Sequence, residues 1–120
     1  MGPLPQEDSK LITCVLSDEA AARLLVETLY GERQITRIEV VPCLASGDLT
    51  RDRTRTGTSP DATMAQLIKI VVPAAEADAV FEYIYEKARI GRPGGGIIFQ
   101  YDLANSTPYV LPDGEVQAHR

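Results

Sequence analysis

The chain has little of what enzymes and metalloproteins commonly use, since its 120 residues include one histidine, two cysteines and no tryptophan. The histidine, His119, is the residue before the last, and Cys14 and Cys43 form no C-x-x-C motif. Neither a nucleophile beside a base nor a metal-ligand spacing can be identified. We therefore expect a non-enzymatic protein without a metal or an obligatory cofactor, and a compact acylphosphatase-like activity is the one catalytic alternative left open.

A surplus of basic residues and a long apolar run are also missing. The net charge is −5, from 12 basic and 17 acidic residues, which argues against a general nucleic-acid binder. No segment approaches the length of a membrane span, and the N-terminal end lacks the features of a signal peptide. These features predict one globular domain in the cytoplasm with no membrane insertion. Cys14 and Cys43, each in an apolar run, are expected to be buried free thiols.

The second half of the chain carries the strongest pattern. The β-branched apolar run Leu67–Val72 predicts a buried strand, and Pro73 suits the start of the helix that follows. Apolar residues then recur at steps of three and four along one helix face, namely Ala77, Val80, Phe81, Ile84 and Ala88. Arg89 falls in the predicted last turn and Gly91 marks the stop. Ile97–Leu103 is predicted to form another strand.

The first half predicts the same order of strand, helix and strand. A loose arm at residues 1–9 precedes a strand over Lys10–Leu16, and Ser17 is a good N-cap for a helix that ends at Gly31. The helix residues expected to face the core are Ala21, Leu24, Leu25 and Leu29. Another strand is predicted over Ile35–Cys43, where apolar and polar residues alternate.

Two segments without periodicity complete the chain. Ser46–Met64 contains almost no apolar residue and carries three alternating arginines, Arg51, Arg53 and Arg55. A loop of this length is usually functional or disordered, so we expect either a segment that orders on a partner or a solvated loop. Residues 104–120 are predicted to form an irregular tail. The complete order, β-α-β-loop-β-α-β, predicts a ferredoxin-like α+β fold with four antiparallel strands and two helices on one face.

The loop between the second helix and the last strand contains the candidate binding residues. Gly91, Arg92 and Gly94–Gly96 place four glycines and one arginine within six residues. Glycines allow backbone N–H groups to line a concavity that fits an anion, and a guanidinium suits phosphate or carboxylate oxygens. The alternative is a connection whose glycines only permit the turn, and composition does not distinguish the two.

These residues resemble the second half of a PII-type signalling protein. The resemblance is carried by Val71-Val72-Pro73 before a helix, by Gly91-Arg92 with Gly94–Gly96 as the family's B-loop, and by Tyr101-Asp102-Leu103 after it. It extends over about Lys10–Leu103 and is weak in the long loop. It implies a homotrimer that binds an adenine nucleotide in each cleft between subunits. It also implies that Ser46–Met64 is the loop that changes conformation with the ligand and docks on partners.

The resemblance assigns nucleotide-binding roles to individual residues. Gly47 matches the glycine at the base of the family's long loop, near the phosphates, and Val71 matches the apolar residue beneath the adenine. Glu39 stands where the family often has a threonine that bonds the adenine edge. The B-loop matches are Gly91, Arg92, Gly94, Gly95 and Gly96. Arg51, Arg53 and Arg55 would then belong to the partner-binding loop.

Three family cations are missing from this sequence. Ile97 replaces the lysine after the B-loop glycines, and residues 104–113 lack the usual pair of arginines. Each lost charge-assisted hydrogen bond weakens binding by roughly 1.5–3 kcal/mol, so we expect AMP or ADP to be favoured over ATP. The long loop has no tyrosine for uridylylation. The resemblance therefore implies a divergent PII-like protein, associated with inorganic carbon and bicarbonate or with a transporter.

We consequently expect a trimeric, non-enzymatic sensor of adenine nucleotides that signals to an unidentified target protein. Two alternatives remain open at this point. One is a structural trimer that binds no ligand, and the other is a small-molecule regulatory domain of the amino-acid-binding type, which has the same order of elements.

Overall fold

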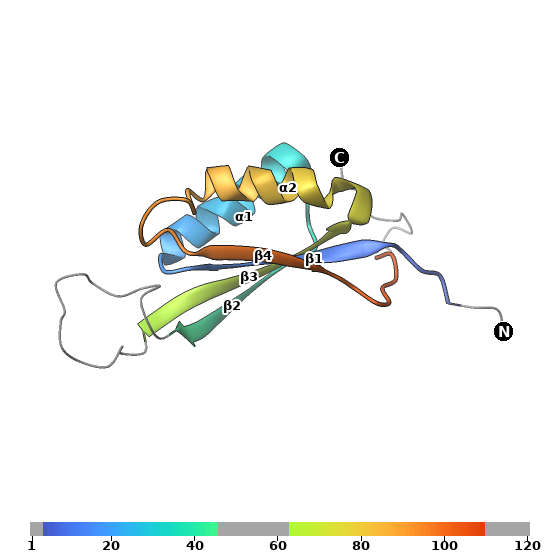
Figure 1. Cartoon of the computed structure of the whole chain (residues 1–120), viewed down its shortest axis with the longest axis horizontal. Coiled ribbons are helices and arrows are strands. Elements are labelled where there is room, and N and C mark those ends of the chain that lie inside the picture. The colour runs from blue at the N-terminus through green and yellow to red at the C-terminus, as the bar shows by residue number, and fades with distance from the viewer. Residues whose placement is uncertain (1–3, 46–62, 110–120) are drawn as a thin grey trace.

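The computed structural model describes residues 4–45 and 63–109, which form one antiparallel sheet with two helices on a single face (Figure 1). The strands are arranged in the order β2-β3-β1-β4. In chain order the elements are β1 (Ser9–Leu16), α1 (Glu19–Arg33), β2 (Ile38–Ala45), β3 (Thr63–Pro73), α2 (Ala74–Lys87) and β4 (Ile97–Asp102). The predicted ferredoxin-like fold is confirmed.

The core lies between the helices and the sheet. Successive strand residues point to opposite faces, so every second residue of β1 and β3 contributes to it. The core residues of these two central strands that are completely buried are Ile12, Cys14, Ile68, Ile70 and Val72. Above them lie the buried helix residues Ala22, Leu25, Leu29, Ala77, Val80 and Ile84. The predicted face of α2 is confirmed, because Phe81 and Ala88 pack against this core as well.

Helix α1 differs from its prediction at both ends. Its N-cap is Asp18 rather than Ser17, and the Asp18 carboxylate accepts a hydrogen bond from the Ala20 amide at 2.9 Å. The helix continues through Gly31 and ends at Gln34, whose φ of 54° is left-handed. The buried face includes Ala22 instead of Ala21, and Leu24 is 62% exposed.

Helix α2 ends in a Schellman motif with an arginine at the left-handed position. Arg89, which was predicted in the last turn, follows the helix with φ 55°. Its amide donates to the Glu86 carbonyl, and the Ile90 amide donates to the Tyr85 carbonyl, which are the two hydrogen bonds of this motif. The helix therefore stops before Gly91, which was expected to be the stop signal.

The strand boundaries are shifted by a few residues. β2 begins at Ile38, three residues after the predicted start, and Ile35 is buried in the connection that precedes it. β3 already begins at Thr63, so Thr63 and Met64 belong to the strand, whereas the prediction placed them in the long loop. Both cysteines are free, as expected, with Cys14 buried and Cys43 half-buried.

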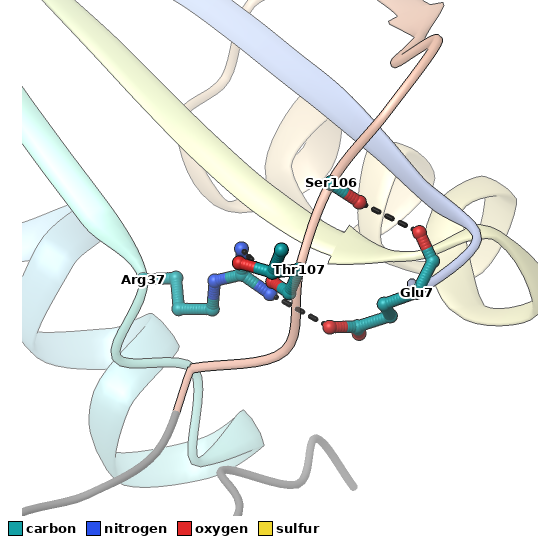
Figure 2. Close-up of polar contacts among 4 residues, drawn as sticks. All are labelled: Glu7, Arg37, Ser106 and Thr107. Carbon is teal, nitrogen blue, oxygen red and sulfur yellow. Dashed lines mark hydrogen bonds and ion pairs between the residues drawn. The ribbon is translucent and has the colours of Figure 1, made fainter. Parts of the chain in front are cut away.

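The two ends of the described chain are joined beside the start of β2 (Figure 2). Arg37 forms an ion pair with Glu7 at 3.0 Å and donates a hydrogen bond to the Thr107 carbonyl. The Ser106 hydroxyl donates to the Glu7 carbonyl, and the Glu7 amide donates to the Ser106 carbonyl. Residues 7–9, which were predicted to lie in a loose arm, are thus bonded to the fold, since Ser9 also begins β1.

The face of the sheet away from the helices, here called the open face, carries many apolar side chains. On β4 they are Ile97, Phe99 and Tyr101, each 44–49% exposed, and the last two rings stack at 6.3 Å. The register and the alternation of side chains place Leu11, Val15, Leu67, Val71 and Val41 on the same face. A largely apolar sheet face that no helix covers is a candidate interface.

Candidate functional site

The glycine loop, residues 91–96, connects α2 to β4 at the end of the sheet where β1 stops (Figure 1). β4 enters opposite Val15, its first register partner, and Gly96 lies against the Val15 carbonyl oxygen. The long segment that follows β2 leaves the same end of the sheet, because Ala45 pairs with Thr63 there. The fold therefore places both loop bases at one end of the molecule.

Backbone geometry accounts for the glycine at position 96. Its φ is +101°, and a Cβ atom would collide with the Val15 carbonyl oxygen. At Gly95 a Cβ would approach three carbonyl oxygens, those of Arg89, Ile90 and Arg92. A side chain at Gly91 would meet the Tyr85 hydroxyl. The geometry of the turn is therefore enough to explain why glycines occupy these positions. Evidence for an anion site must come instead from the polar groups that have no partner in the turn.

Two amides of the loop are left free by this turn. The Arg92 amide donates to the Arg89 carbonyl at 3.4 Å, and the Gly95 amide donates to the Arg92 carbonyl at 2.9 Å. Within the described residues, the amides of Gly94 and Gly96 make no hydrogen bond. Gly94 has a φ of +73°, a left-handed conformation that also occurs in anion-binding concavities of the backbone. An anion could accept hydrogen bonds from these amides, but not beside Gly95, where carbonyl oxygens converge.

Two arginines at the glycine loop, Arg92 within it and Arg89 before it, have no carboxylate partner among the residues that the structure describes. Arg92 and Arg89 are both exposed, and neither forms an ion pair with any residue in the described ranges 4–45 and 63–109. By contrast, Arg23 pairs with Glu19 and Arg37 pairs with Glu7. Residues 88–97 thus contain two arginines and no acidic residue, a locally basic segment on a chain whose net charge is −5.

The adenine contacts assigned by the resemblance lie toward the end of the open face that is opposite the glycine loop, where β3 ends and β2 begins. Val71 is the register partner of Leu11, and Glu39 is the partner of Lys69. Val71 lies four residues beyond Leu67, which is opposite Val15 at the loop end, so about 13 Å of strand separates it from the glycine loop. One chain thus does not bring the predicted adenine contacts together with the predicted phosphate contacts.

Other predicted residues lie outside the described part of the chain. Gly47 and the three arginines Arg51, Arg53 and Arg55 fall in residues 46–62, which the structure does not describe. No group of three or more potential ligands that could hold a metal ion occurs among residues 4–45 and 63–109. None of the helices that the structure describes is both long and apolar enough to cross a membrane.

Two titratable groups are perturbed, and neither lies in the glycine loop. Burial raises the pKa of the Cys14 thiol to about 12, so this thiol is protonated and unreactive in the folded protein. The pKa of Tyr83 is also raised to about 12, by desolvation and by the hydrogen bond that its hydroxyl donates to Glu32. Arg33 lies over the Tyr83 ring at 4.5 Å. These contacts join α1 to α2 and serve structure.

Sequence reasoning assigned no binding role to Arg89 or Tyr85, although both border the loop. Arg89 was expected to complement the helix dipole, and its left-handed backbone has no signal in the sequence, because glycine is the usual residue there. Tyr85 is four residues before Arg89, and its hydroxyl covers Gly91. A helical projection would not have related the two residues, because Arg89 lies beyond the end of α2.

Comparison with known proteins finds relatives by structure alone. No family model matches the chain, and no curated protein matches its sequence. Among solved structures, CutA from Synechococcus elongatus PCC7942 superposes with a TM-score of 0.65 and 12% identity, covering 87% of this chain and 84% of that protein. The GlnK–ATP complex from B. subtilis superposes with a TM-score of 0.63 and 22% identity, covering 82% of this chain and 84% of GlnK. CutA1 from Pyrococcus horikoshii superposes with a TM-score of 0.63 and 14% identity, covering 82% of this chain and 86% of CutA1.

These structures cover most of the chain, at identities that establish the fold only. GlnK is the protein in this group whose structure was solved with ATP. The resemblance to PII-type proteins, inferred from the residues around the glycine loop, is confirmed at the level of the fold. The chain therefore has the fold of GlnK and CutA.

Proposed function

We propose that the protein is a non-enzymatic regulatory protein that senses adenine nucleotides. The observation that carries the proposal is the glycine loop: among the described residues, the amides of Gly94 and Gly96 make no hydrogen bond, and the guanidinium of nearby Arg92 forms no ion pair. Phosphate oxygens are suited to both kinds of donor. The likeness to GlnK, a protein solved with ATP, supports an adenine nucleotide as the source of the phosphate. The cytoplasmic location expected from the sequence is part of this proposal.

The proposed assembly is a homotrimer whose nucleotide sites lie between subunits. The loop of one copy would supply the phosphate contacts, and Val71 and Glu39 of the next would supply the adenine contacts, because one chain keeps the two sets apart. The apolar open face, with Phe99 and Tyr101 at its edge, provides surface that such an assembly can bury. A ring of three copies uses one heterologous interface three times and closes.

The proposed ligand order follows from the missing cations. Ile97 is apolar and 49% exposed at the position where the resembling family has a lysine, so one phosphate contact is lost. We therefore propose AMP or ADP as the preferred effector, with ATP bound more weakly. Bicarbonate is proposed as a second small anion beside the nucleotide. The signal would pass through residues 46–62, with Gly47 near the phosphates and Arg51, Arg53 and Arg55 facing an unidentified target protein or transporter.

Calorimetric titration with AMP, ADP and ATP, each with and without bicarbonate, tests this function. We expect one site per chain with micromolar affinity, about 8 kcal/mol. Arg92→Ala should weaken ADP binding about tenfold or more, whereas Arg23→Ala, on the exposed side of α1, should leave it unchanged. Failure of all three nucleotides to bind would refute the proposal. Sedimentation equilibrium should give three times the chain mass.

Two alternatives predict different results. A structural trimer would sediment as a trimer without binding any nucleotide. A regulatory domain of the amino-acid-binding type would bind amino acids and would be insensitive to Arg92→Ala. The free amides and unpaired arginines at one loop favour the nucleotide sensor over both.

A further inference from the structure

We propose that Arg89, which lies between α2 and the glycine loop, is a second phosphate-binding residue beside Arg92. This inference rests on the proposed function and assigns a new residue to the same site. Three independent observations support it: the position of Arg89 just before the glycine loop, its backbone conformation, and the absence of a partner for its charge among the described residues.

The position of Arg89 places its Cα close to Arg92. The Arg92 amide donates to the Arg89 carbonyl, so the two arginines are the first and fourth residues of one turn. The ends of such a turn lie less than about 7 Å apart at Cα. Arginine side chains are long enough for both guanidinium groups to reach one diphosphate from these positions. Gly94 and Gly96, with the free amides, follow directly.

The backbone of Arg89 is held in a conformation that glycine adopts at lower cost. Its φ of 55° is left-handed, and it is the C′ residue of the Schellman motif that ends α2. Residues in sparsely populated backbone regions concentrate at functional sites, and here the retained side chain is a cation at the entrance of an anion-binding loop. Gln34 has the same conformation at the end of α1, with φ 54°, and provides an internal comparison away from the loop.

The charge of Arg89 is free. Each of the arginines before it in the described residues has a partner: Arg23 pairs with Glu19, Arg33 lies over the Tyr83 ring and Arg37 pairs with Glu7. Arg89 and Arg92 have no such contact within the described ranges. An exposed cation without a partner keeps its full capacity for a ligand anion.

The ligand class that fits this pair is a nucleoside diphosphate. The amides and Arg92 would hold one phosphate group, and Arg89 would hold the other. A monophosphate would engage one guanidinium only. Loss of Arg89 should therefore lower the affinity for ADP more than the affinity for AMP, and this difference separates a phosphate contact from a general loss of positive charge.

The test compares Arg89→Gly with Gln34→Gly, two changes at equivalent backbone positions. Both should raise the thermal midpoint, because glycine adopts the left-handed conformation without a Cβ penalty. Only Arg89→Gly should weaken ADP binding, about tenfold, with a smaller loss for AMP, whereas Gln34→Gly should bind both as the wild type does. Arg89→Lys keeps the charge and should retain most of the affinity, and Arg89→Asn, which tolerates the same backbone, should not.

The outcomes separate the inference from the function on which it rests. Wild-type protein that binds ADP, with Arg89→Gly and Arg89→Asn binding equally well, would overturn the role of Arg89 and leave the sensor intact. An equal loss for ADP and AMP would overturn the assignment to the second phosphate. Wild-type protein that binds neither nucleotide would refute the proposed function and the inference together.

Discussion

Replacing Gly96 by alanine should destabilise the fold strongly, because position 96 combines two requirements that only glycine meets. Its φ of +101° is unfavourable for an L-residue, at about 1–3 kcal/mol. A Cβ would also collide with the Val15 carbonyl oxygen, which is part of β1 and cannot move without distorting the pairing of β1 with β4. We expect a total loss of about 2–4 kcal/mol in the free energy of unfolding.

Gly31→Ala provides a matched control, because it should change the free energy of unfolding in the opposite direction. Gly31 lies within α1, and a Cβ there would meet no atom within 4 Å. Alanine should therefore stabilise the helix by about 0.5–1 kcal/mol. Urea unfolding followed by circular dichroism, at one protein concentration for all variants, measures both changes. Equal stability of Gly96→Ala and the wild type would refute the loop geometry, and destabilisation by Gly31→Ala would refute the helical path through that residue.

Three further predictions concern the ion pair, a tyrosine and a thiol. Glu7→Gln should lower the free energy of unfolding by about 1–3 kcal/mol, because the ion pair that it breaks with Arg37 is mostly buried (Figure 2). Glu19→Gln breaks an exposed ion pair and should lower it by no more than about 0.5 kcal/mol in the same urea assay. Tyr83→Phe should make the free energy of unfolding less dependent on pH at alkaline pH. The pKa of Tyr83 in the folded protein is about 12, above its ordinary value of 10.0. The wild type therefore gains stability from this group below pH 10 and loses that stability as the pH rises toward 12. A steeper fall for Tyr83→Phe than for the wild type in that range would contradict this sign. Cys14 should react with a thiol reagent only after unfolding, and rapid labelling of Cys14 in the native protein, located by mass spectrometry, would contradict its burial.

The periodicity of the sequence was sufficient for the element types and their order. Apolar residues at helical spacing in Ala77–Ala88 and the β-branched run Leu67–Val72 each specify one kind of element, because only one backbone geometry brings their apolar side chains to a single face. The order of these elements then leaves few arrangements besides a ferredoxin-like sheet. The resemblance around the glycine loop indicated the same fold from different residues.

Element ends were predicted less well, because contacts between elements decide them. Gly31 favours ending α1, yet the next turn places Glu32 against the Tyr83 hydroxyl and the Lys87 ammonium, and Arg33 over the Tyr83 ring. These contacts with α2 offset the roughly 1 kcal/mol by which glycine disfavours a helix. The early start of β3 has a similar cause, since Thr63 pairs with Ala45 on β2. No local pattern contains either interaction.

The candidate site divides in the same way. Gly91, Arg92 and Gly94–Gly96 were found from the sequence, because an accumulation of glycines next to an arginine is visible in any reading of the chain. The sequence by itself also determined the buried face of α2 and the order of strands and helices, since side-chain periodicity controls both. Only the tertiary structure decided which amides remain free, which arginines lack partners, and that Arg89 adopts a left-handed backbone, because each depends on where the chain's other donors and acceptors lie in space.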